Sequence, residues 1–126
     1  MAAFPSAGNP LHWRGLVETR EFYGLYEIRL GDEFDPRQGR LFYKSEIPLA
    51  VLQAARGTEA FQVFLDFSQF PFWRVAPVAG PENAIRVEAL DLRFGNPTEP
   101  GFVATVILNS GQPVRAWFEF GNPRPR

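Results

Sequence analysis

The side chains that could perform chemistry in this sequence are few and scattered. The densest acidic group is Asp32, Glu33 and Asp35, in a segment whose composition predicts a loop. Hard cations favour carboxylate oxygens, but this spacing lacks the glycine and the distal glutamate of an EF-hand loop. We therefore interpret the group as part of a solvated loop and predict no metal ligand in this chain.

Nucleophilic catalysis finds equally little support. His12 is the single histidine, and neither a Ser–His–Asp pattern nor a nucleophile elbow surrounds it. The lack of cysteine excludes disulfides, thiolate nucleophiles and Cys-type zinc sites. No glycine-rich phosphate-binding motif is present, because the glycines punctuate turns. The sequence thus predicts no catalytic residue and a packed or hydrogen-bonded role for His12.

Aromatic and charged residues in three stretches form a candidate binding patch instead. Asp91 and Arg93 share one parity, and Arg74 follows Trp73 in another predicted strand. If those strands pair, Arg74 meets Asp91, and a cross-strand ion pair is favoured over the polar floor of a small pocket. The patch comprises His12, Trp13, Arg14, Phe70, Trp73, Arg74, Asp91 and Arg93.

The strongest physical feature is a concentration of aromatic rings between Phe61 and Trp73. Their spacing changes from helical to strand-like across Pro71, which favours a helix that packs on the following strand. The alternative is that some of these rings, such as Phe70 or Trp73, stay exposed and contact lipid or a partner protein.

Composition narrows the remaining function classes. The chain has 126 residues, with 13 Lys+Arg against 14 Asp+Glu, so no basic surface for nucleic acid is expected. A spanning helix needs about 20 mostly apolar residues, and runs such as Phe102–Leu108 are far shorter. We expect a soluble protein with one domain over 11–121, a linker-like segment over 1–10 and a disordered tail over 122–126.

Periodicity predicts the elements that must position these residues. Alternation favours strands over 13–20, 22–30, 72–78, 85–94, 102–108 and 114–120. Between them, Pro48 and Gly57 are typical of the ends of one helix, and Thr58 and Pro71 bound a second. The apolar residues before and after Ala89 and Leu90 alternate out of phase, and a β-bulge there would place both sets on the same face of the strand. The fold class is therefore α+β, with a mostly antiparallel curved sheet of about six or seven strands and an inserted helical pair.

Three stretches together resemble a known family. They are Asn9–Thr19 (NPLHWRGLVET), Phe61–Val75 (FQVFLDFSQFPFWRV) and Asp91–Phe94 (DLRF), the last followed by the apolar strand GFVATVIL. This order resembles the soluble C-terminal region of bacterial membrane-bound, inner-membrane-associated, metal-dependent hydrolases. The resemblance implies a parent protein whose membrane-embedded part holds a divalent metal on His and Asp residues. No position of this chain matches those ligands, so no catalytic residue carries over.

The first functional expectation follows from that resemblance. The chain would be a non-catalytic accessory domain, without a cofactor of its own, that contacts the membrane-embedded part of the parent or another protein. The alternatives are a stand-alone small-ligand-binding protein and a module that contacts protein or lipid through exposed aromatic rings.

Overall fold

The chain divides into two compact units, 1–44 and 45–126. The computed structural model describes residues 2–6, 9–29, 39–78 and 84–120. Each unit has a four-stranded antiparallel sheet of its own. The expectation of a single sheet is therefore wrong, since strands that follow one another in sequence pair within two separate sheets. The predicted tail over 122–126 and the acidic loop around Asp32 lie outside the described residues.

The first unit is a sheet with the strand order β1-β2-β3-β4. Its strands are β1 (Ala2–Ser6), β2 (Asn9–Glu18), β3 (Phe22–Arg29) and β4 (Arg40–Tyr43). Part of the predicted linker over 1–10 thus forms β1 and the beginning of β2. Backbone pairing with β2 imposes this conformation although the local composition does not favour it, and Pro5 is tolerated because β1 is an edge strand with a register irregularity at Pro5/Ser6.

The first unit has a small core around Leu16 and Tyr23, which are both buried. The turn between β2 and β3 is held by Thr19, whose hydroxyl oxygen accepts hydrogen bonds from the backbone N–H groups of Glu21 and Phe22. Lys44 lies over the Tyr23 ring and donates a 2.7 Å hydrogen bond to Glu18. That hydrogen bond lowers the pKa of the Glu18 carboxyl.

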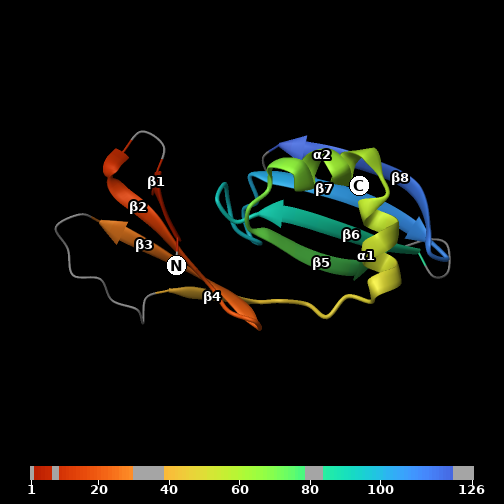
Figure 1. Ribbon diagram of the computed structural model, residues 1–126, viewed down its shortest axis with the longest axis horizontal. Helices are drawn as coiled ribbons and strands as arrows, with labels where there is room; N and C mark the ends of the chain where they lie inside the picture. The colour runs from red at the N-terminus through yellow and green to blue at the C-terminus, as the bar shows by residue number, and fades with distance from the viewer. Residues whose placement is uncertain (1, 7–8, 30–38, 79–83, 121–126) are drawn as a thin grey trace. The chain divides into compact units, whose positions relative to one another are not determined.

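The second unit packs two helices on one face of its sheet (Figure 1). The helices are α1 (Leu49–Arg56) and α2 (Glu59–Phe67), and the strands are β5 (Pro71–Pro77), β6 (Ala84–Asp91), β7 (Phe102–Asn109) and β8 (Gln112–Phe120). The strands follow one another in the order β5-β6-β7-β8. The inserted helical pair and the α+β class are therefore confirmed.

The helices begin and end at the residues that the sequence indicates, with two differences in detail. Pro48 precedes α1, and the Gly57 N–H donates to the Gln53 carbonyl at its end. The Thr58 hydroxyl does not cap α2 but donates back to the Ala55 carbonyl of α1 at 2.7 Å. Leu49 is 64% exposed in the first turn of α1, although its spacing from Leu52 and Ala55 predicts that it lies on the same side of the helix as they do.

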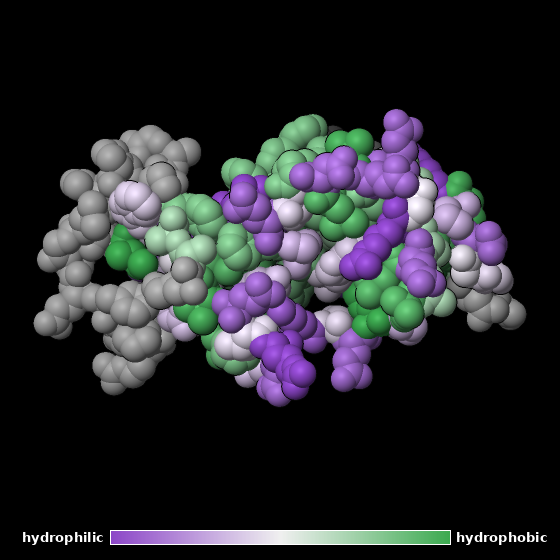
Figure 2. Space-filling view, in the orientation of Figure 1, coloured by the Kyte–Doolittle hydropathy of each residue, from purple (hydrophilic) through white to green (hydrophobic). Residues whose placement is uncertain are grey.

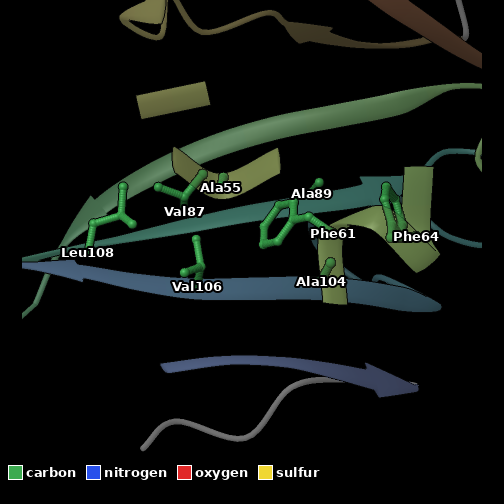
Figure 3. Packing of buried hydrophobic residues seen from close by; sticks show 8 residues of the cluster. All are labelled: Ala55, Phe61, Phe64, Val87, Ala89, Ala104, Val106 and Leu108. Carbon is green, nitrogen blue, oxygen red and sulfur yellow. The ribbon is translucent and has the colours of Figure 1, made fainter. Parts of the chain in front are cut away.

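The core of the second unit lies between the helices and the two central strands. Ala55, Phe61 and Phe64 project from the helices onto small and branched side chains of β6 and β7 (Figure 3). The facing side chains are Val87, Ala89, Ala104, Val106 and Leu108. The alanines leave room for the two phenylalanine rings, so the helical layer lies close to the sheet.

The central strands are buried on both faces, which agrees with the apolar residues at both odd and even positions of β7. Val103 and Ala104, which point to opposite faces, are both fully buried. The expected bulge near Ala89 and Leu90 is absent from the register of β6, because both of its parities are buried there and no residue has to change face. A register irregularity occurs instead in β7 between Ile107 and Leu108.

Removal of the Phe64 ring tests this core. Phe64→Ala is expected to lower the free energy of unfolding by about 3–5 kcal/mol, because a fully buried ring leaves a cavity that the sheet cannot fill. Val63→Ala is the matched control, since Val63 is half exposed in the same helix and should change stability by less than about 1 kcal/mol. Urea denaturation of both variants measures the difference, and equal costs would contradict the assigned packing.

Candidate functional site

The structure distributes the sequence-predicted patch over both units. His12, Trp13 and Arg14 belong to β2, where Trp13 is paired with Ile28 and Arg14 with Glu27. Phe70, Trp73, Arg74, Asp91 and Arg93 belong to the second unit, and the structure brings Asp91 and Arg93 together.

Asp91 and Arg93 form a buried ion pair at the end of β6. The Arg93 Nη2 atom donates to Asp91 Oδ2 at 2.9 Å, and the backbone N–H of Arg93 donates to Asp91 Oδ1 at the same distance. The Asp91 carboxylate also accepts from the backbone N–H of Gln69 at 3.2 Å. Asp91 is fully buried, so these donors replace the water that a carboxylate otherwise needs.

The same ion pair holds the end of α2. Arg93 Nη2 donates a second hydrogen bond, of 2.9 Å, to the carbonyl oxygen of Phe67, the last residue of the helix. A cation at this position satisfies a helix carbonyl that lacks an intrahelical partner. The Leu92 N–H donates to the Phe70 carbonyl, so the segment from Phe67 to Phe70 is fixed to the end of β6. We call this arrangement the Asp91–Arg93 clamp.

The clamp determines the protonation of Asp91. Burial raises the pKa of the carboxyl, but the hydrogen bonds and the positive charge of Arg93 outweigh burial, so the pKa lies below its ordinary value. The Ser68 hydroxyl also lowers the pKa, although this buried hydroxyl forms no hydrogen bond of normal geometry with the described residues. Asp91 is therefore an ionised structural carboxylate at neutral pH.

Arg74 does not meet Asp91. In the register of β5 and β6, Arg74 is opposite Glu88, while Asp91 is opposite Pro71. Arg74 Nε lies 3.3 Å from Glu88 Oε1, and its Nη1 donates a 2.6 Å hydrogen bond to the Pro97 carbonyl. Arg74 therefore forms its cross-strand ion pair with Glu88 and not with Asp91, because the register places Glu88, three residues before Asp91, opposite Arg74.

Trp73 and Phe70 are both partly buried, so neither is the exposed ring that the sequence suggested as an alternative. Trp73 stacks on Phe61 with ring centroids 5.5 Å apart and lies beneath the guanidinium of Arg56. Successive residues of a strand point to opposite faces, so Trp73 faces the helices and Arg74 faces away from them.

The exposed rings of the second unit include the last residue of α2 and two residues of other segments. Phe67, Phe94 and Phe120 are 37%, 48% and 72% exposed. Each contacts Phe102 in an edge-on geometry, with centroid distances of 5.7, 5.3 and 4.7 Å. Phe118 links them to the core, because it contacts both Phe120 and the buried Phe64. We call the set Phe67, Phe94, Phe102, Phe118 and Phe120 the phenylalanine edge.

The phenylalanine edge is a surface feature with a border of polar residues. Figure 2 shows hydrophobic residues at the surface around α2, next to hydrophilic ones. Arg93 is part of that border, since its guanidinium lies 4.8 Å from the Phe94 ring centroid. Exposed apolar clusters of this kind, with a polar rim, are typical of protein contact sites.

The sheet face that points away from the helices carries a second group of residues. Arg86, Ile107 and Arg115 lie opposite one another across β6, β7 and β8. Both guanidiniums lie over the Trp117 ring, at 5.9 and 4.8 Å from its centroid. The indole N–H of Trp117 donates to Glu119 at 2.9 Å. Neither arginine forms an ion pair with a described residue.

Sequence reasoning missed the phenylalanine edge and the two arginines. The signal for the edge was Phe118 and Phe120, which share a parity at the end of the last strand, together with Phe102 at the start of the preceding one. A two-residue hairpin turn at Ser110 and Gly111 brings those ends together. The pairing of Arg86 with Arg115 across β7 requires the register of three strands, which composition alone does not provide.

Within the described ranges, no group of three or more His, Cys, Asp or Glu side chains could hold a metal ion. No helix over these residues is long and apolar enough to cross a membrane.

The clamp predicts how stability depends on pH. The folded pKa of Asp91 is depressed, so its contribution is fully present above the unfolded value of about 3.9 and is lost as pH falls through the folded pKa. At neutral pH, Asp91→Asn should lower the free energy of unfolding by about 3 kcal/mol, because Arg93 is left largely buried without its partner. Between pH 7 and pH 2, the urea midpoint of Asp91→Asn should fall less steeply with decreasing pH than that of the wild type. Asp66→Asn is the exposed control and should match the wild type.

The loop that follows the clamp also depends on one close approach. A Cβ atom at Gly101 would overlap the carbonyl oxygen of Phe94, which is backbone and cannot rotate away. Gly101→Ala should therefore lower the free energy of unfolding by more than about 2 kcal/mol. Gly57→Ala is the matched control, because its Cβ would meet only ordinary contacts of 3.5 and 3.6 Å. Equal urea midpoints for the two variants would contradict this loop geometry.

Comparison with known families corrects the resemblance drawn from the sequence. The family model that matches residues 50–117 is the YfhP C-terminal alpha/beta plait domain, not the C-terminal region of membrane-bound metal-dependent hydrolases. Of the three stretches that carried the resemblance, Phe61–Val75 and Asp91–Phe94 belong to the second unit, whereas Asn9–Thr19 belongs to the first. The expectation of a metal-bearing parent at the inner membrane depended on that resemblance alone.

The matched range contains α2, all of α1 but its first residue, and most of the second sheet. Comparison with curated proteins and with solved structures gave no significant match. Two helices on one face of a four-stranded antiparallel sheet agree with an alpha/beta plait. Since the match spans more than half of the chain, the protein belongs to the YfhP C-terminal alpha/beta plait domain family.

Proposed function

We propose that the second unit is a non-catalytic protein-contact module and that the phenylalanine edge is its contact surface. The observation that carries the proposal is the exposure of Phe67, Phe94 and Phe120 in one connected group of rings. Aromatic rings are enriched in protein interfaces because they bury a large area and lose little conformational entropy.

The exposed rings leave hydrophobic free energy available to a binding partner. A fully buried aromatic side chain contributes about 1.5–3 kcal/mol relative to an exposed one. Phe120 is 72% exposed and realises little of this in the unbound chain. A partner that covers Phe67, Phe94 and Phe120 would bury the rest of their apolar surface. The free energy of that burial would be concentrated at one location, as in an interaction hot spot.

The clamp supports the proposal through rigidity. Arg93 holds the carbonyl of Phe67 and lies over the ring of Phe94, so two of the three exposed phenylalanines are attached to one buried ion pair. A rigid apolar surface binds with less loss of conformational entropy than a mobile one. The proposed contact site is therefore organised before any partner arrives.

Site-specific crosslinking in cells that produce the full chain tests the proposal. A photoreactive residue at Phe120 should crosslink to a protein partner, whereas the same residue at the exposed Gln62 of α2 should not. The partner is then purified, and Phe120→Ser should weaken its binding at least about tenfold. Val63→Ser is the matched control, because Val63 is an exposed apolar residue of α2 outside the phenylalanine edge. Equal crosslinking from both positions, or crosslinks to lipid alone, would overturn the proposal.

A further inference from the structure

The phenylalanine edge includes the end of β8, and β8 is an edge strand. In the strand order β5-β6-β7-β8, β8 has β7 as its neighbour among the described strands. Its residues from Gln112 to Ala116 are exposed, and its last residue, Phe120, is more exposed than the rings around it. An exposed edge strand offers backbone donors and acceptors at the spacing that another extended chain requires.

The two edges of this sheet are not equivalent. β5 begins and ends with proline, at Pro71 and Pro77, and proline cannot donate to a ladder. In β8 the single proline is Pro113, near the strand's beginning, so the seven residues from Val114 to Phe120 contain none. The geometry therefore favours β8 as the edge that accepts another strand.

The two faces of β8 specify different side chains in such a strand. Ala116, Phe118 and Phe120 share the face of the helices, because they pair with Val106, Ala104 and Phe102 of that face, so residues opposite them would be apolar. On the other face, Arg115 completes a row with Ile107 and Arg86. Both arginines lack an ion pair with a described residue, and a residue opposite Arg115 would extend the same row. An acidic side chain there would lie directly opposite Arg115.

We propose that β8 binds an extended segment of the partner protein by strand addition, and that this segment alternates apolar residues with an acidic residue opposite Arg115. The inference rests on the proposed function and names the chemistry of the partner. Backbone hydrogen bonds to β8 would supply affinity, and side chains at alternate positions would supply specificity. Trp117 holds both guanidiniums near the row, which reduces the entropy lost when they bind a carboxylate.

The direct test uses two synthetic peptides of about seven residues, the length of a typical strand. One alternates valine with threonine and has glutamate at its centre, and the other has lysine there. Fluorescence anisotropy with the full chain should give about tenfold tighter binding of the glutamate peptide, because opposite charges attract and like charges repel across a sheet. Hydrogen exchange should show slower exchange of β8 amides when the glutamate peptide is added.

Charge reversal and backbone methylation make the test decisive. Arg115→Glu should reverse the preference between the peptides; Arg115 is exposed, so the variant should fold, as circular dichroism can verify. Methylation of alternate peptide nitrogens should abolish binding if the peptide adds as a strand. Equal affinities of the two peptides, full binding of the methylated peptide, or no binding at millimolar concentration would each overturn this inference. Crosslinking from Phe120 to a protein partner does not depend on strand addition. If the peptide experiments fail while that crosslinking is observed, this inference is wrong and the proposed function still holds.

Discussion

The end of α2 is the constraint on which the second unit depends. Pro71 begins β5, so the helix must end before it, and the Asp91–Arg93 clamp fixes the last helical carbonyl at Phe67. Phe61 and Phe64 are fully buried against the central strands. Phe67, at the end of the helix, contacts the ring of Phe102, which in turn contacts Phe120. The exposed phenylalanine edge is therefore a geometric consequence of a buried ion pair.

The two sheet faces of the second unit are organised by different forces. On the helical face, alanines of β6 and β7 admit the rings of α2, and apolar burial dominates. On the other face, Arg74 joins Glu88 to the carbonyl of Pro97, so a salt bridge attaches the loop after the clamp to the sheet. Buried ion pairs stabilise little relative to apolar residues, but they specify one arrangement. The clamp and the Arg74 pair both act at the ends of segments, where backbone groups otherwise lack partners.

The local elements of this fold were predictable because proline, glycine and periodicity act over a few residues. Pro48, Gly57 and Pro71 placed the helices, and the alternation after Phe72 placed the last four strands. Long-range pairing was not predictable from the same signals. Nothing local distinguishes a break between two sheets at Lys44 from another loop, and the choice of Glu88 over Asp91 for Arg74 follows from the register of β5. The candidate binding patch likewise combined residues of both units. The cluster of exposed rings outside the patch could not be predicted, because it forms only when the strands pair and their ends come together.

In the DLRF stretch, a structural ion pair and a binding site have the same signature in the sequence. An Asp and an Arg of one parity beside aromatic residues are equally typical of a ligand site and of a structural clamp. Burial separates the two cases here: Asp91 is fully buried and accepts hydrogen bonds from Gln69 and Arg93, so it has no exposed oxygen to offer a ligand. Arg86 and Arg115 present the opposite case, since both are charged and at least partly exposed and their guanidiniums meet no carboxylate among the described residues. Positive charge that meets no carboxylate among the described residues is a stronger indication of binding than a pair whose hydrogen bonds are already satisfied.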